Sequence, residues 1–231
     1  MTRPDRPTQH LLLLLLGVVV LVVAGTDQHL AYVRAGFRPF LLAAGVVAVG
    51  LAVGGLLRPR AGGHEHPGPA VGWLLAAPVA VVLVVAPPAL GSYTAARQAA
   101  PVAVPAGGGV ALGPDDQGAD FRTMRLFDYL VASQAQPAEL DGRRVRLVGF
   151  VSPRAAGGWY VTRFAVNCCA ADATAVRVAV PAGPADVRPD QWVEVVGTAT
   201  VPLTDPAVGY PEPAIDAVSV QVVEAPAETY E

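Results

Sequence analysis

The sequence predicts a protein in two parts, an α-helical membrane region with three spans and a mainly β C-terminal domain. Hydrophobic residues make up 53% of the chain and charged residues only 15%, well below the usual quarter of a globular protein. The long uncharged apolar runs all fall within residues 1–94. Residues 121–231 instead carry short apolar–polar alternations separated by turn residues, a pattern typical of strands.

The first expected span lies near residues 8–26 and contains the run "LLLLLLGVVVLVVAG". No charge occurs between Arg6 and Asp27, which is enough chain to cross a bilayer core. A cleaved signal peptide is the alternative, because Arg3 and Arg6 precede the apolar run. The further spans that follow favour a retained helix.

The second and third expected spans lie near residues 39–57 and 71–90. The second contains Gly50 and Gly54 in "GLAVG", a small-xxx-small pattern that allows close helix packing. Trp73 and Tyr93 flank the third, as aromatic residues do at membrane interfaces.

The arginines predict the orientation of these spans. The positive-inside rule assigns the flanks with more arginine to the cytoplasm, here Arg3, Arg6, Arg58 and Arg60 against Arg34, Arg38 and Arg97. A retained first span and a cleaved signal both place the C-terminal domain outside. We therefore expect a multi-pass cell-membrane protein, in contact with membrane lipid, whose C-terminal domain is extracytoplasmic.

Two polar segments interrupt or follow the spans. His64 and His66 flank Glu65 in the second loop, where they form either a transient metal site or a solvated loop. Residues 95–120 are rich in Pro, Ala and Gly without periodicity, which predicts a tether.

The C-terminal domain is expected to begin with a helix and continue with five strands. The segment "FRTMRLFDYLVAS", residues 121–133, has its apolar residues on roughly one helical face. The strand patterns cover residues 143–151, 158–166, 174–180, 191–201 and 214–224. Five short strands in so few residues favour a small OB-like barrel, with a sandwich as the second choice.

Cys168 and Cys169 are the only cysteines, and Asp172 follows them closely in "NCCAAD". Neighbouring Cα atoms lie about 3.8 Å apart, whereas ordinary disulfides need about 4.4–6.8 Å, so a bridge between them would be strained. Successive side chains of a strand point to opposite faces. Both sulfurs can therefore reach one ion only if the chain leaves strand geometry near Asn167.

Three interpretations of the cysteine pair remain open. Cys168, Cys169 and Asp172 could bind zinc or another soft metal ion. The cysteines could instead be small buried apolar residues, or a reactive thiol pair. An extracytoplasmic thiol needs burial or a ligand to escape oxidation.

The sequence lacks the motifs that are typical of several classes of function. The chain has no phosphate loop, HExxH motif, nucleophile elbow or paired catalytic carboxylates, so no enzymatic activity is predicted. The net charge is −3, which provides no electrostatic footprint for nucleic acid.

The segments "LDGRRVRLVGFV", "YVTRFAVNCCAADA" and "QWVEVVGTATV" resemble the YcgQ-like family, bacterial membrane proteins described as permease subunits. The resemblance implies a partner, a multi-span permease encoded nearby. The resemblance brings no established activity, but together with the cysteine pair it favours a non-enzymatic accessory subunit of a permease complex that handles a soft metal or metalloid through Cys168 and Cys169. A membrane-tethered thiol or redox protein and a purely structural envelope module are the alternatives.

Overall fold

The computed structural model describes residues 6–57, 88–98, 109–112, 116, 118–204 and 211–231, with single positions at 74, 77 and 81. It forms two compact units, Met1–Ala89 and Leu90–Glu231. The expected third span, 71–90, lies almost wholly outside the described residues, as do His64 and His66.

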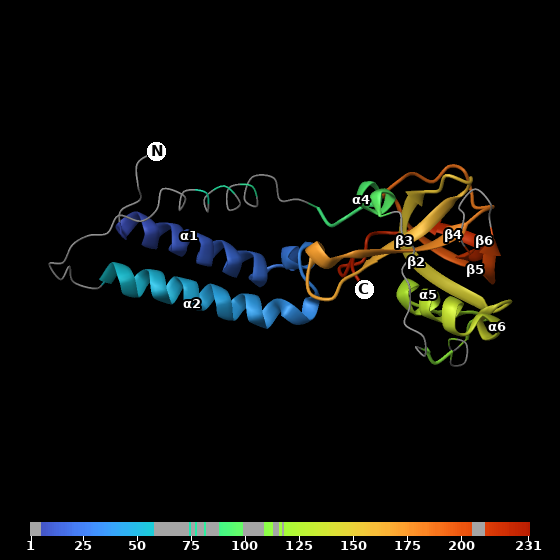
Figure 1. The fold of residues 1–231 in the computed structure, drawn as a ribbon, viewed down its shortest axis with the longest axis horizontal. Helices are drawn as coiled ribbons and strands as arrows, with labels where there is room; N and C mark the ends of the chain where they lie inside the picture. The colour runs from blue at the N-terminus through green and yellow to red at the C-terminus, as the bar shows by residue number, and fades with distance from the viewer. Residues whose placement is uncertain are drawn as a thin grey trace. The chain divides into compact units, whose positions relative to one another are not determined.

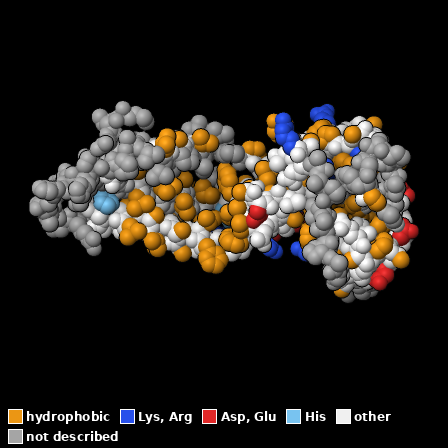
Figure 2. All heavy atoms as spheres, viewed as in Figure 1, with side chains coloured by type: hydrophobic (Ala, Val, Ile, Leu, Met, Phe, Trp, Pro, Cys, Tyr) orange, Lys and Arg blue, Asp and Glu red, His pale blue; other side chains and the backbone are white. Residues whose placement is uncertain are grey.

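The first unit contains two long apolar helices, α1 (Arg6–Gly25) and α2 (Arg38–Leu57). They lie side by side (Figure 1), and the short helical turns η1 (Asp27–Ala31) and η2 (Ala35–Phe37) connect them. Both are long and apolar enough to cross a membrane by length and composition, and many of their apolar side chains are exposed (Figure 2).

Glycines allow α1 and α2 to approach closely. A Cβ added at Gly17 would lie 2.9 Å from a methyl group of Val49, and one at Gly45 would lie 2.7 Å from the Leu21 side chain. Cβ atoms at Gly50 and Gly54 would meet no described atom within 4 Å. The predicted small-residue contact at Gly50 and Gly54 is therefore not the one that joins α1 to α2.

The second unit is built on a closed, five-stranded mixed β-barrel. Its strands are β2 (Arg144–Pro153), β3 (Trp159–Ala165), β4 (Thr174–Val180), β5 (Trp192–Thr204) and β6 (Pro211–Val222). They follow the order β2-β3-β4-β6-β5, and pairing of β5 with β2 closes the barrel. Only the β4–β6 pair within the barrel is parallel. This topology is that of an OB-fold, so the first-choice prediction is confirmed over the sandwich.

The helix predicted from residue 121 begins later than expected. Arg122 and Thr123 form β1 (Arg122–Thr123), which pairs in parallel with β2, and α5 (Leu126–Ala135) starts after it. The short helix α6 (Pro137–Leu140) follows. Backbone pairing with β2 has replaced the first helical turn that the apolar periodicity predicted.

The core lies between α5 and the inward faces of the strands. Leu126, Tyr129 and Leu130 of α5 join the valines and leucines of the barrel in one buried cluster, and Tyr129 donates its hydroxyl to the carbonyl of Ala214 at 2.5 Å. α5 contacts four of the barrel strands. Its apolar face thus replaces water at one end of the barrel, where exposed core side chains would destabilise the fold.

Candidate metal centre

The cysteine pair lies in the loop between β3 and β4. The last residue of β3, Ala165, pairs with the first residue of β4, Thr174. Between them the chain leaves strand geometry at Val166, bends at Asn167, and forms the helical turn η4 (Ala170–Asp172). The break near Asn167 that a shared ion requires is therefore present in the fold.

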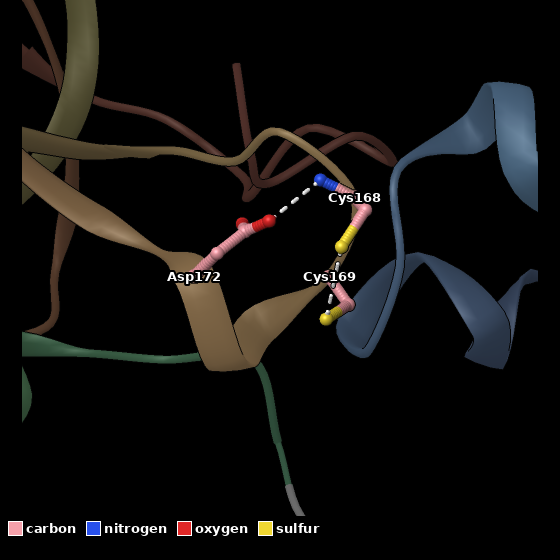
Figure 3. Close-up of side chains that lie close together, drawn as sticks. All are labelled: Cys168, Cys169 and Asp172. Carbon is pink, nitrogen blue, oxygen red and sulfur yellow. Dashed lines mark hydrogen bonds between the residues drawn. The ribbon is translucent and has the colours of Figure 1, made fainter.

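The loop brings together the three residues that the sequence singled out. The sulfur of Cys168 lies 3.4 Å from that of Cys169, and the ligand atoms of Cys168, Cys169 and Asp172 all lie within 4.8 Å of one another. Figure 3 shows both sulfurs on one side of the loop. Both cysteines are half-buried and Asp172 is exposed, so an ion can reach them from solvent.

Asp172 also organises the loop that carries the cysteines. Its carboxylate accepts the backbone N–H of Asn167 at 3.0 Å and that of Cys168 at 2.9 Å. The pKa of Asp172 is lowered, mainly by the hydrogen bond from the Cys168 thiol and then by the Cys168 N–H. The carboxylate is thus held in its charged form beside the sulfurs.

The same contact keeps Cys168 protonated. The hydrogen bond to Asp172, followed by the one to Cys169, raises the pKa of Cys168 from 9.0 to about 12. A thiol with such a pKa is a poor nucleophile at neutral pH, because the thiolate is the reactive form. A bound cation would displace this proton and would also screen the thiolate from Asp172.

The distances between the candidate ligand atoms fit a soft ion once the Asp172 carboxylate has moved closer to the two sulfurs. With metal–sulfur bonds of about 2.3 Å, the observed separation of 3.4 Å corresponds to a sulfur–metal–sulfur angle of about 95°. A tetrahedral zinc ion would hold a sulfur and a carboxylate oxygen about 3.6 Å apart, whereas these ligand atoms are spread over distances of up to 4.8 Å. Asp172 therefore has to approach the sulfurs by up to about 1 Å, and a fourth coordination position stays open.

Within the described ranges, Cys168, Cys169 and Asp172 form the one group of three or more possible metal ligands. The other candidate ligands from the sequence, His64 and His66, lie outside those ranges.

A second concave feature lies at the start of α5. This cleft of about 270 Å³ is lined by Val110, Arg122, Thr123, Met124, Arg125, Asp128, Val148 and Arg163. Its charges are paired within the protein: Arg125 forms an ion pair with Asp128 at 2.9 Å, and Arg163 lies 3.5 Å from the Glu231 carboxylate. Sequence reasoning missed Glu231, because nothing local in the sequence links it to Arg163.

The fold and the cysteine loop define a class of protein, an OB-like β-barrel domain that carries a vicinal cysteine pair and follows apolar N-terminal helices. Residues 121–231 match the family model of the DUF1980 C-terminal domain. The match is consistent with the resemblance to the YcgQ-like family. No curated protein and no solved structure matches the chain.

Proposed function

We propose that this protein is a non-enzymatic, membrane-anchored accessory subunit of a permease complex, and that its barrel domain binds a soft metal or metalloid ion through Cys168 and Cys169. Asp172 supplies the third ligand. One observation carries this proposal: the two sulfurs lie 3.4 Å apart on a loop that has left strand geometry. Adjacent cysteines on a continuous strand would point to opposite faces.

The raised pKa of Cys168 argues against redox or nucleophilic thiol chemistry. Redox and nucleophilic cysteines have lowered pKa values, set by nearby cations or helix N-termini. Here the nearest charged partner is the carboxylate of Asp172, which acts in the opposite direction.

The permease partner rests on the resemblance to the YcgQ-like family. In this proposal α1 and α2 anchor the chain in the cell membrane, and the barrel presents the loop on the extracytoplasmic side. An open coordination position suits an ion that is passed on, since structural zinc sites usually have four protein ligands.

Metal content tests the ion-binding part. The full chain is purified under reducing conditions, incubated with Zn²⁺, desalted and measured by mass spectrometry. We expect about one equivalent of zinc in the parent and little in Cys168→Ser or Cys169→Ser, with the exposed Asp186→Asn as the control that retains zinc. Parent protein that stays metal-free while its thiols remain reduced would contradict ion binding.

Two further measurements test the remaining parts. The permease encoded nearby should co-purify with the tagged chain. A reporter that is active only outside the cytoplasm, fused after Glu231, should be active, and activity from a cytoplasmic reporter alone would reverse the proposed orientation.

A further inference from the structure

Residues 90–98, hereafter the strap, lie on the barrel and contain the short helix α4 (Ser92–Arg97). One end is fixed at the loop before β5. The Ser92 N–H and hydroxyl donate to the two carboxylate oxygens of Asp190 at 2.5 and 2.8 Å, and the Leu90 N–H donates to the Tyr230 hydroxyl at 3.0 Å.

The other end is fixed beside the cysteine loop by Gln98. Its side-chain oxygen accepts the N–H of Ala175 at 2.7 Å, and its side-chain nitrogen donates to the carbonyl of Ala173 at 2.9 Å. Arg177 donates to the backbone carbonyl of Gln98. The Gln98 amide therefore bridges the backbone on both sides of Thr174, directly after Asp172.

The strap packs on the first barrel strand, β2, and its Gln98 reaches the start of β4. It therefore lies next to the face on the second and third barrel strands, here β3 and β4, that OB-folds commonly use for ligands. Phe150 pairs with Thr162, and Phe164 pairs with Ala175; the rings of Phe150 and Phe164 stack at 5.8 Å. Neither ring belongs to the core cluster, yet both are almost fully buried. α4, whose Ser92 and Ala95 are buried, packs on β2 beside them.

The turn η4 connects the candidate ligands to the strap anchor. The Asp172 N–H donates to the carbonyl of Cys169 at 3.0 Å, and the Ala173 N–H donates to that of Ala170. Ala173, whose carbonyl accepts the Gln98 amide, follows Asp172 directly, so a shift of the Asp172 backbone toward the sulfurs would displace that carbonyl. A backbone shift of about 1 Å would take a hydrogen bond of ordinary length beyond the range in which it is effective, and Gln98 would then lose one of its two bonds.

We propose that ion binding at the cysteine loop detaches the Gln98 end of the strap from the start of β4. The inference rests on the proposed function and adds a readout to it: the loaded loop differs from the empty one in how tightly this end of the strap is held. Binding linkage is reciprocal. A strap that favours the empty loop must weaken ion binding, and loosening the strap must strengthen it.

Hydrogen exchange on the full chain with Zn²⁺ as the probe tests this coupling. We expect the amides of residues 92–98 to exchange several-fold faster when zinc is bound, and Cys168→Ser to abolish that response. Gln98→Ala should exchange fast with or without zinc and should bind zinc about threefold to tenfold more tightly, the effect of one or two hydrogen bonds. Gln98→Glu keeps the acceptor for Ala175 and loses the donor to Ala173, and should show a smaller shift in the same direction.

Tyr93→Ala is the matched control, because Tyr93 lies on α4 but is 70% exposed. It should leave both the zinc affinity and the exchange response unchanged. The coupling would be contradicted if the parent bound zinc stoichiometrically with no change in exchange over residues 92–98. It would also be contradicted if Gln98→Ala bound zinc with unchanged affinity. Neither result would contradict the ion site itself. A parent chain that binds no zinc would overturn the proposed ion site and the coupling with it.

Discussion

The carboxylate of Asp172 accepts the backbone N–H of Cys168 at 2.9 Å, and its proximity to the thiol of the same cysteine raises the pKa of that thiol. A single acidic side chain thus sets both the position and the protonation of the first cysteine.

Replacing Asp172 with Asn should make Cys168 more reactive. The hydrogen bond to Asp172 is the largest cause of the raised pKa of Cys168, so its loss should lower that pKa and increase the thiolate fraction at a fixed pH. While the pH lies well below the pKa, each unit by which the pKa falls raises the thiolate fraction about tenfold. Alkylation rates at pH 8–9, measured in a Cys169→Ser background, provide the test. Asp186→Asn is the control, and equal rates in both variants would contradict the assignment.

Arg154 and Glu212 form a buried ion pair whose disruption should be costly. The two side chains are 2% and 3% exposed and lie 2.5 Å apart, and the Tyr160 hydroxyl donates to Glu212 at 2.9 Å. Arg154→Met leaves a buried carboxylate without its cation, for which we expect a loss of about 3–5 kcal/mol in the free energy of unfolding. The double variant Arg154→Met/Glu212→Leu should recover most of it. Denaturant unfolding measures both, and a double variant as unstable as the single one would contradict this account.

Glu231 should make the stability of the barrel domain fall as pH rises. Burial is the main cause that raises the pKa of Glu231 above 4.5, although N–H groups of α5 and Arg163 oppose it. The folded state therefore binds this proton more tightly than the unfolded state, and stability declines between pH 4.5 and the folded-state pKa. Glu231→Gln should remove that part of the pH dependence. Melting temperatures from pH 4 to 7 test it, with the exposed Glu224→Gln as the control that should keep the parent profile.

Substitutions of two glycines in α2 should differ in their effect on the association of α1 with α2. Gly45→Val places a side chain against Leu21, where a Cβ would already lie 2.7 Å away, whereas Gly50→Val meets no described atom near its Cβ. We expect only the first to weaken the association of α1 with α2. Cross-linking between cysteines introduced on facing positions of the two helices, in detergent, would report the difference. Equal loss in both variants would show that Gly50 also packs against α1.

The strap should contribute to the stability of the barrel domain. A fragment of residues 109–231 lacks α4, which packs on β2, the strand that carries the buried Phe150, whereas a fragment of residues 90–231 retains it. Full burial of a large apolar side chain is worth about 1.5–3 kcal/mol, so the shorter fragment should be less stable by about 3 kcal/mol. It should also bind a hydrophobic dye more strongly. Matching unfolding curves would show that the strap does not stabilise that face.

Much of this architecture could be predicted from local patterns. The two-residue period of "RRVRLVGFV" and "TAVRVAV" identifies strands because alternate side chains of a strand face opposite sides. The short strands and their turns also favoured a barrel. Apolar runs without charges identify membrane-length helices for a similarly local reason. The break in the chain at Asn167 was a requirement for the shared ion rather than a deduction, and the fold contains it.

Contacts between segments far apart in the sequence could not be predicted from local patterns. Gln98 lies 77 residues before Ala175, and Leu126 lies 105 residues before Glu231; no periodicity links such pairs. The start of α5 shows the same limit, since the apolar pattern from residue 121 suits a helix until β2 offers Arg122 and Thr123 a strand partner. Local sequence determined the elements and the ligand types at the loop. Closure of the barrel and the position of the strap were decided by the tertiary structure, because each depends on which backbone groups remain unpaired once the strands have met.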